Sequence, residues 1–378
     1  MTMVATDTTA ERRVDSQPTS GNQPFQDDPA GAEQVLTRRR GLPLMVMLVI
    51  ALVIAVVAAA GIGAFPISPG EVITSILRKL GISSTVGDQT AEAVLWDIRL
   101  PRIALSLLVG AALGCAGAAM QGTFANPLAE PGIVGVSAGA SLGAVIAIVA
   151  GATALGTWSL PAAAFAGGLA TVVGVYVTAR ADGRTEVITL VLTGVAVNAM
   201  VGAFIGLATF LSDDSQLRSI TFWTLGSMAQ ASWAKVAVVA PLVVLGVAAS
   251  LVMSRQLDLL ALGERQAGHL GVDVERLRIV MLAVIALLTA GAVAVSGMVL
   301  FVGLVIPHLI RMIAGPTHRV LIPASALAGA LVLVLADLTA RTIAAPQELP
   351  LGVLTSLVGS PFFFWQLRRT RASQGGWS

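Results

Sequence analysis

Residues 279–310 contain no Asp, Glu, Lys or Arg. This charge-free stretch is longer than the roughly 20 apolar residues that a helix needs to cross the hydrocarbon core of a bilayer, yet too short for two full crossings and a loop. Gly303 and Pro307 lie in its second half. We therefore predict a full helix over 279–300 and a short one over 301–312, an irregularity typical of membrane transporters.

The composition also favours a membrane protein. Hydrophobic residues make up 56% of the 378 residues and charged residues 12%, against about 25% charged in a typical soluble domain. The mean hydropathy is +0.85. The single Cys115 excludes an intrachain disulfide, three histidines leave little material for a metal site, and a net charge of +2 does not favour nucleic acid as a partner. We predict an all-α, multi-pass protein of the cell membrane without a metal site.

Ten segments are candidate membrane spans, and arginines cluster in the segments that this count places on the side of the N-terminus. The positive-inside rule then puts both termini in the cytoplasm. We expect residues 41–370 to form the membrane domain, between a disordered cytoplasmic tail over 1–40 and a short cytoplasmic tail over 371–378. The ten spans cover approximately residues 43–63, 103–122, 135–152, 160–179, 187–211, 236–253, 279–300, 301–312, 320–340 and 351–367.

Three connecting segments are longer than simple turns. On the outer side, residues 70–80 are amphipathic and residues 212–235 start with two aspartates, so both segments are predicted to carry interfacial helices. On the cytoplasmic side, residues 254–278 are polar, mixed in charge sign and helical in pattern. This segment is either a solvated loop or a docking surface for a cytoplasmic partner.

The chain lacks the residues for nucleotide hydrolysis or ion coupling. Its only lysines, Lys79 and Lys235, do not belong to the glycine-rich turn of a P-loop. Asp337 and Arg341 have the spacing of a local ion pair on a helix, which we favour over a proton relay. We expect no enzymatic activity in this chain, ATP hydrolysis on a separate subunit if ATP drives transport, and a cargo other than a naked metal ion.

Several motifs then occur in an order that resembles one known family, the permeases of iron–siderophore and cobalamin ABC importers, which are type II importers. The resemblance covers about residues 45–370. It implies ten transmembrane helices in two inverted halves, a dimer with a second identical or related permease, two cytoplasmic ATPase subunits and an external substrate-binding protein. It places ATP and magnesium on the partner ATPase and no cofactor in this chain. The motifs span residues 98–102, 109–114, 120–131, 135–140, 262–271, 301–311, 318–323, 336–341 and 348–352.

The resemblance carries three sites over by motif. Arginines at the outer ends of the second and ninth spans would meet acidic residues of the binding protein; they are Arg99, Arg102 and Arg341. Two short helices in the cytoplasmic segment would dock on the ATPase, with glycines for tight turns and an alanine for close approach of the partner. The residues of this coupling site are Leu262, Gly263, Glu264, Ala267, Leu270 and Gly271.

The third site is the pathway and inner gate, where prolines break the chain between the second and third spans. By resemblance, Asn126 and Leu128 lie near the inner constriction, and residues 186–189 form another part of the gate. The candidate residues are Gln121, Asn126, Pro127, Leu128 and Pro131.

We therefore expect an ATP-driven, binding-protein-dependent importer that works by alternating access, with ferric siderophores as the favoured cargo. Cobalamin and haem stay open as alternatives. Haem is slightly less favoured because the only tyrosine, Tyr176, and the three histidines lie near the inner side. An ion-coupled secondary carrier and a membrane-embedded enzyme such as a lipid transferase are more remote, because the spans lack the ionisable clusters that either would need.

Overall fold

The computed structural model describes residues 29–79, 81–82, 88–181 and 184–373. Contacts divide the chain into two units, residues 1–36 and 37–378, and the fold described below is that of the second unit. Its described part is helical apart from one two-residue hairpin, which confirms the predicted helical class. The helices are α1 (Pro29–Gly61), α2 (Pro69–Lys79), α3 (Gln89–Ala93), α4 (Leu100–Thr123), α5 (Val136–Val149), α6 (Ser159–Ala179), α7 (Val187–Leu211), α8 (Asp214–Leu225), α9 (Trp233–Val252), α10 (Ser254–Leu260), α11 (Glu264–His269), α12 (Val274–Ser296), α13 (Val302–Ala314), α14 (His318–Ala340) and α15 (Leu351–Ser373).

Smaller elements complete the chain. A π-helix, η1 (Val94–Arg99), leads into α4, and the 3₁₀ helices η2 (Pro131–Val134) and η3 (Ala152–Leu155) flank α5. Strands β1 (Arg180–Ala181) and β2 (Arg184–Thr185) form an antiparallel hairpin between α6 and α7. The hairpin departs from the purely helical prediction, because β1 and β2 pair in the connection between two apolar segments.

An apolar helix overlaps each of the ten predicted segments, but not all of these helices are long enough to cross a membrane. Among the described residues, seven helices are long and apolar enough to cross a membrane, and three shorter apolar helices are Val136–Val149, Val302–Ala314 and Leu351–Trp365. The charge-free stretch divides as predicted into a full helix and a short one. The break comes earlier than expected, at Gly297, whose positive φ of 67° ends α12, and a second positive φ of 66° at Phe301 starts α13.

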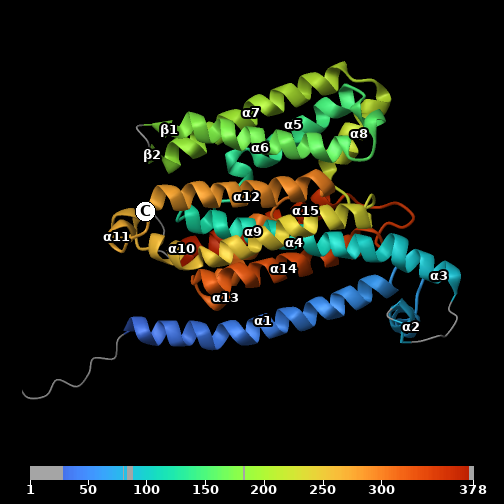
Figure 1. The fold of residues 1–378 in the computed structure, drawn as a ribbon, viewed down its shortest axis with the longest axis horizontal. Helices are drawn as coiled ribbons and strands as arrows, with labels where there is room; N and C mark the ends of the chain where they lie inside the picture. Colours follow the sequence, from blue (N-terminus) through green and yellow to red (C-terminus); the bar gives the residue numbers. More distant parts are fainter. Residues whose placement is uncertain (1–28, 80, 83–87, 182–183, 374–378) are drawn as a thin grey trace, which may run out of the picture. The chain divides into compact units, whose positions relative to one another are not determined.

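The connecting segments gather at two opposite ends of the helices (Figure 1). One end, called the α10 end, holds α10, α11 and the β-hairpin, whereas the other, called the α2 end, holds α2, α3 and α8. The two predicted interfacial helices are present as α2 and as α8, which a capping box from Asp213 and Gln216 starts. Segments predicted on opposite sides of the membrane therefore lie at opposite ends of the bundle.

Helix α4 is the most buried element, with its side chains enclosed almost without interruption from Leu105 to Thr123. Glycine allows this enclosure, because backbones can touch where a side chain is missing. A Cβ added at Gly110 would collide with Gly329 of α14, and one at Gly117 would collide with Gly303 of α13. The α5–α6 pair uses the same device, with Gly139 against Gly167.

Two predicted boundaries differ from the structure. Residues 29–40, which we expected in a disordered tail, belong to α1, and the rest of that tail lies outside the described residues. At the other terminus, α15 continues to Ser373, so part of the predicted tail over 371–378 is helical and residues 374–378 lie outside the described residues.

Candidate functional site

The three predicted docking arginines lie together at the α2 end, an arrangement we call the arginine cluster (Arg99, Arg102 and Arg341). The π-helix η1 ends at Arg99, α4 carries Arg102 in its first turn, and Arg341 follows the last residue of α14. A Cβ added at Gly63 would lie 2.6 Å from Arg99 Nη2 and 3.5 Å from Arg341 Nη1. Two guanidinium groups thus flank one glycine just after α1.

Arg102 is held by two carboxylates of its own chain. Its Nε donates to both carboxylate oxygens of Asp337, at 2.9 and 3.0 Å, and its Nη1 and Nη2 donate to Glu348 at 2.7 and 2.9 Å. Arg102 and Asp337 are 7% and 2% exposed, so a buried salt bridge connects α4 with α14. Such charge-assisted, two-pronged contacts are among the strong hydrogen bonds of proteins.

The other two arginines cap the carboxyl end of α1. Arg99 donates to the carbonyl oxygens of Ala60 and Gly61, at 2.6 and 3.0 Å, and to that of Phe65, whereas Arg341 donates to Ala59. Helices end with unpaired carbonyls and a partial negative charge, which guanidinium groups satisfy. Burial lowers the pKa of Arg341, and the charge of Asp337 opposes this shift.

This geometry corrects one expectation and adds a partner to another. We predicted outward-facing arginines available to a partner, but all three are largely buried and bonded within the chain. The predicted ion pair between Asp337 and Arg341 is present, with Arg341 Nε 4.0 Å from the carboxylate, but Arg102 is the closer partner of Asp337, at 2.9 Å. Sequence spacing predicts which side chains are neighbours on one helix, but it does not predict that Arg102 of another helix lies beside Asp337.

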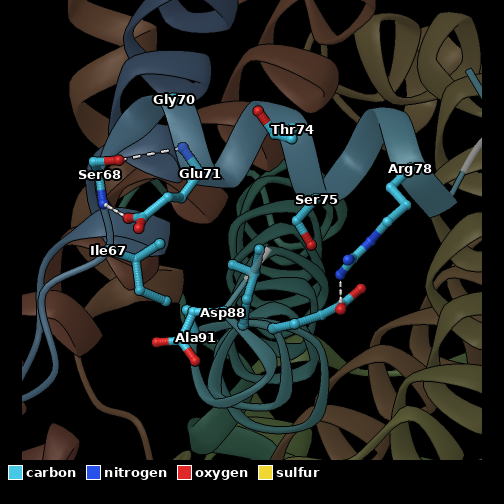
Figure 2. A pocket seen from close by; sticks show the side chains of 11 residues that line it. Ile67, Ser68, Gly70, Glu71, Thr74, Ser75, Arg78, Asp88 and Ala91 are labelled. Carbon is cyan, nitrogen blue, oxygen red and sulfur yellow. Dashed lines mark hydrogen bonds and ion pairs between the residues drawn. The ribbon is translucent and has the colours of Figure 1, made fainter. Parts of the chain in front are cut away.

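A hollow of about 460 Å³ opens between α2 and α3 at the same end (Figure 2). Ser68 and Glu71 exchange backbone-to-side-chain hydrogen bonds at the start of α2, and Arg78 near the end of α2 forms an ion pair with Glu92 of α3. These charged groups are engaged locally. The hollow is therefore part of the surface of the α2 end, but Glu71, Arg78 and Glu92 already have partners within the chain and do not present a free charge to a ligand.

The predicted coupling segment, residues 254–278, forms two short helices at the α10 end, as the resemblance implied. Gly263 and Gly271 adopt positive φ angles of 110° and 85°, which favour glycine and reverse the chain on either side of α11. Leu262 and Leu270 are 60% and 58% exposed beside these turns. Ala267 corrects its predicted role, because it is fully buried within the chain and cannot face a partner.

An ionic network anchors α11 to the rest of the protein. Arg278 of α12, only 3% exposed, donates to Glu264 at 2.6 Å and to the carbonyl oxygen of Thr185 at 2.8 Å. Glu275 accepts from the backbone N–H and the hydroxyl of Thr185, at 3.0 and 2.6 Å. The β-hairpin, α11 and α12 are thus joined, a role for Arg278 and Glu275 that the sequence pattern did not single out.

The predicted gate residues divide into an exposed and a buried group. In the loop over residues 124–135, which we call the gate loop after its predicted role, Asn126 accepts a hydrogen bond from the backbone N–H of Leu128 at 2.9 Å, and Leu128 is 41% exposed. Pro127 is also exposed. Pro131 is buried at the start of η2, where Asn198 of α7 donates to Gly132 at 3.1 Å.

Gln121 does not line an open pathway. Its side chain is 1% exposed and donates to the carbonyl oxygen of Leu304 at 3.2 Å, which ties α4 to α13. An amide placed near the end of a predicted span is equally compatible with a pathway or a helix contact. Only the packing of α13 against α4 assigns it to the contact.

Comparison with known proteins identifies the architecture. The profile of the FecCD transport family matches residues 50–369. The chain belongs to this family. The family is one of transport permease subunits of ABC importers, so the chain is a multi-pass protein of the cell membrane whose partners are an ATPase and a substrate-binding protein. This confirms the predicted resemblance and localisation.

Individual relatives differ in the cargo that their names state. The hemin transport system permease HmuU of Yersinia pestis is 42% identical over 333 residues, covering 87% of this chain and 96% of the relative. The cobalamin import permease BtuC of Halobacterium salinarum is 44% identical and covers 74% of each chain. The Fe(3+) dicitrate permease FecD of Escherichia coli is 43% identical, covering 74% of this chain and 86% of the relative.

A solved structure has the same fold. It is described as an inward-facing conformation of a metal-chelate type ABC transporter. The two structures superpose with a TM-score of 0.76 at 32% identity, over 86% of this chain and 99% of the other.

Proposed function

We propose that this chain is half of a permease dimer that imports an iron chelate, either a ferric siderophore or haem, by alternating access. Ten transmembrane helices per chain, both termini in the cytoplasm, would place the α10 end inside and the α2 end outside. Cobalamin is the second candidate cargo, favoured by the similarity to a cobalamin permease. The permease family and the relatives named for hemin and ferric dicitrate support the iron chelate.

The coupling segment supports an ATP-driven mechanism. Two exposed leucines, Leu262 and Leu270, protrude beside short helices that a buried arginine, Arg278, anchors to the membrane domain. Exposed apolar side chains on a rigid, polar-rimmed segment are typical of a docking surface. We infer that the cytoplasmic ATPase binds here, and that its closure on ATP moves the segment as a body.

The arginine cluster suits a different role from the one that sequence alone suggested. Arg102 is held between buried Asp337 and Glu348, whose side chain is 40% exposed. We infer that the binding protein docks at the α2 end and that the arginines brace this surface. An acidic group of the binding protein could reach Arg102 only by displacing Glu348.

Reconstitution tests the importer. The chain is placed in vesicles with its ATPase and binding protein, and uptake of labelled hemin, ferric siderophore and cyanocobalamin is compared. We expect uptake of an iron chelate that requires both ATP and the binding protein. Uptake of cyanocobalamin alone would overturn the cargo, and uptake driven by a proton or sodium gradient without ATP would overturn the mechanism.

A second experiment tests the docking surface. Leu262→Ser and Leu270→Ser should each weaken binding of the ATPase by about tenfold, since loss of a buried leucine at an interface costs on the order of 1.5 kcal/mol or more. The matched control is Leu155→Ser, because Leu155 is 85% exposed at the opposite end. Binding is measured by titration in detergent, and equal affinities for all three variants would contradict the proposal.

A further inference from the structure

One carboxylate joins the coupling segment to the membrane helices. Asp258 of α10 accepts, through Oδ1, from the backbone N–H of His318 at 2.8 Å and lies 2.7 Å from Nδ1 of the same residue. His318 is the first residue of α14 and is 1% exposed. The carboxylate thus caps another helix, satisfying an unpaired N–H at the positive end of its dipole.

The imidazole of His318 in turn lies against α4. A Cβ added at Gly122 would collide with Nε2 of the His318 ring, so the ring fills the space that this glycine leaves. Gly122 is followed within two residues by the gate loop, residues 124–135, which contains the exposed Leu128. One route from α10 to the gate loop therefore runs through the buried side chain of His318, beside the direct contacts between α10 and α4.

Helices α4 and α14 are matched along their whole length. They meet through Gly122 and His318 at the α10 end, through Gly114 and Ser325 and through Gly110 and Gly329 in the middle, and through the Arg102–Asp337 salt bridge at the α2 end. From His318 to Asp337, α14 extends about 28 Å at 1.5 Å per residue. Close backbone contact resists sliding, because packed interiors do not deform continuously.

We propose that Asp258 and His318 are positioning residues that transmit movement of the ATPase-docked segment to the gate loop. The inference rests on the proposed function, because it requires the ATPase to bind residues 254–278. Arg311 of α13 contributes a nearby positive charge that attracts the carboxylate of Asp258. Loss of the Asp258 carboxylate would leave ATPase docking intact, but movement of the docked segment would no longer be transmitted to the gate loop.

The test follows two positions by thiol labelling in the assembled transporter. Leu128→Cys and Leu262→Cys are made singly in a Cys115→Ala background, which removes the chain's own buried cysteine. Inside-out vesicles are treated with a membrane-impermeant maleimide, with and without ATP and magnesium. We expect the ATPase to protect position 262, and nucleotide to change the labelling rate at position 128 by at least about fivefold, the lower range of allosteric coupling.

Asp258→Ala should reduce the nucleotide effect at position 128 to less than about twofold while protection at position 262 persists. Asp258→Asn keeps an oxygen that accepts both hydrogen bonds and should restore the effect. Asp273→Ala is the matched control, because Asp273 caps its own helix α12 through the N–H of Arg276 in the same segment. If Asp258→Ala does not assemble, His318→Leu removes the ring contact and preserves the cap, with the same expected loss.

The outcomes separate the two proposals. If the ATPase does not protect position 262, the proposed function is wrong. If position 262 is protected but Asp258→Ala or His318→Leu retains the full nucleotide effect at position 128, the inference is wrong. Protection at 262 without any nucleotide effect at 128 in the parent chain overturns the inference as well.

Discussion

Buried charge organises this protein at the level of single residues. Arg102 binds Asp337, which lies 235 positions away in the sequence, and binds the carboxylate of Glu348 at the same time. A buried ion pair adds little over well-packed apolar residues, but removal of one partner leaves an uncompensated charge. Loss of an arginine from the cluster would therefore destabilise the α2 end mainly because a buried carboxylate would be left without its partner.

Arg102→Met should lower the free energy of unfolding by about 3–5 kcal/mol, because Asp337 stays buried without its cation. Adding Asp337→Leu to this variant should recover much of the loss, since the orphaned charge is then removed. Thermal unfolding in detergent measures both. Arg218→Ala, at an exposed position of α8, is the control and should change stability by less than about 0.5 kcal/mol.

Glu130 gives a pH-dependent prediction in the gate loop. Burial raises the pKa of its carboxyl above the ordinary value. The protonated carboxyl of Glu130 is therefore the form that the fold tolerates. Its contribution to the free energy of unfolding is fully present below the unfolded-state pKa of about 4.3 and is lost as the pH rises through the folded-state pKa. Glu130→Gln should therefore raise the melting temperature at pH 8 by roughly 2 °C or more, with a smaller gain at pH 5.

The comparison for this prediction is Glu186→Gln, because Glu186 is exposed and its replacement should change the melting temperature little at either pH. A gain for Glu130→Gln that is equal at pH 5 and pH 8 would show that packing, rather than ionisation, is responsible.

Close backbone contact decides how the elements pack. The apolar surface of α4 has no preferred neighbour in a bilayer, because lipid is as apolar as another helix, so shape selects the partner. Glycines provide that shape against α13 and α14. The helices can be located from the sequence because apolar length alone defines a span, but the sequence does not show which glycine faces which helix.

Gly117→Ala should destabilise the protein by about 1–3 kcal/mol, because the added methyl group collides with the backbone of Gly303. Gly174→Ala in α6 has open space around the added Cβ and should be stabilising by about 0.5–1 kcal/mol, since alanine is the better helix former. Unfolding of the two variants is compared in the same detergent. Equal stability losses would argue against the α4–α13 contact.

At the scale of the whole molecule, the two ends have different chemistry. The α10 end carries the anchored coupling segment and the exposed leucines, and the α2 end carries the arginine cluster and the amphipathic helix α2. An importer needs this polarity, because the cargo arrives on one side and ATP is used on the other.

Sidedness can be measured directly in a Cys115→Ala background. Leu155→Cys should react with an impermeant maleimide from outside intact cells, whereas Leu262→Cys should react only in inside-out vesicles. Both leucines are exposed, and three long apolar helices, α6, α7 and α9, lie between them in the chain. Reaction of both positions from the same side would contradict the predicted topology.

Apolar length and the order of motifs are properties of the linear sequence, so the membrane class, the ten apolar segments and the family could all be predicted from it. The helical coupling segment also followed from local pattern. The roles of individual side chains emerge only from the packed fold. Ala267 and Gln121 are buried, Asp337 binds Arg102 more closely than its neighbour Arg341, and Asp258 caps a helix that starts 60 residues later. These contacts depend on which helices pack together, and that choice is made by three-dimensional shape.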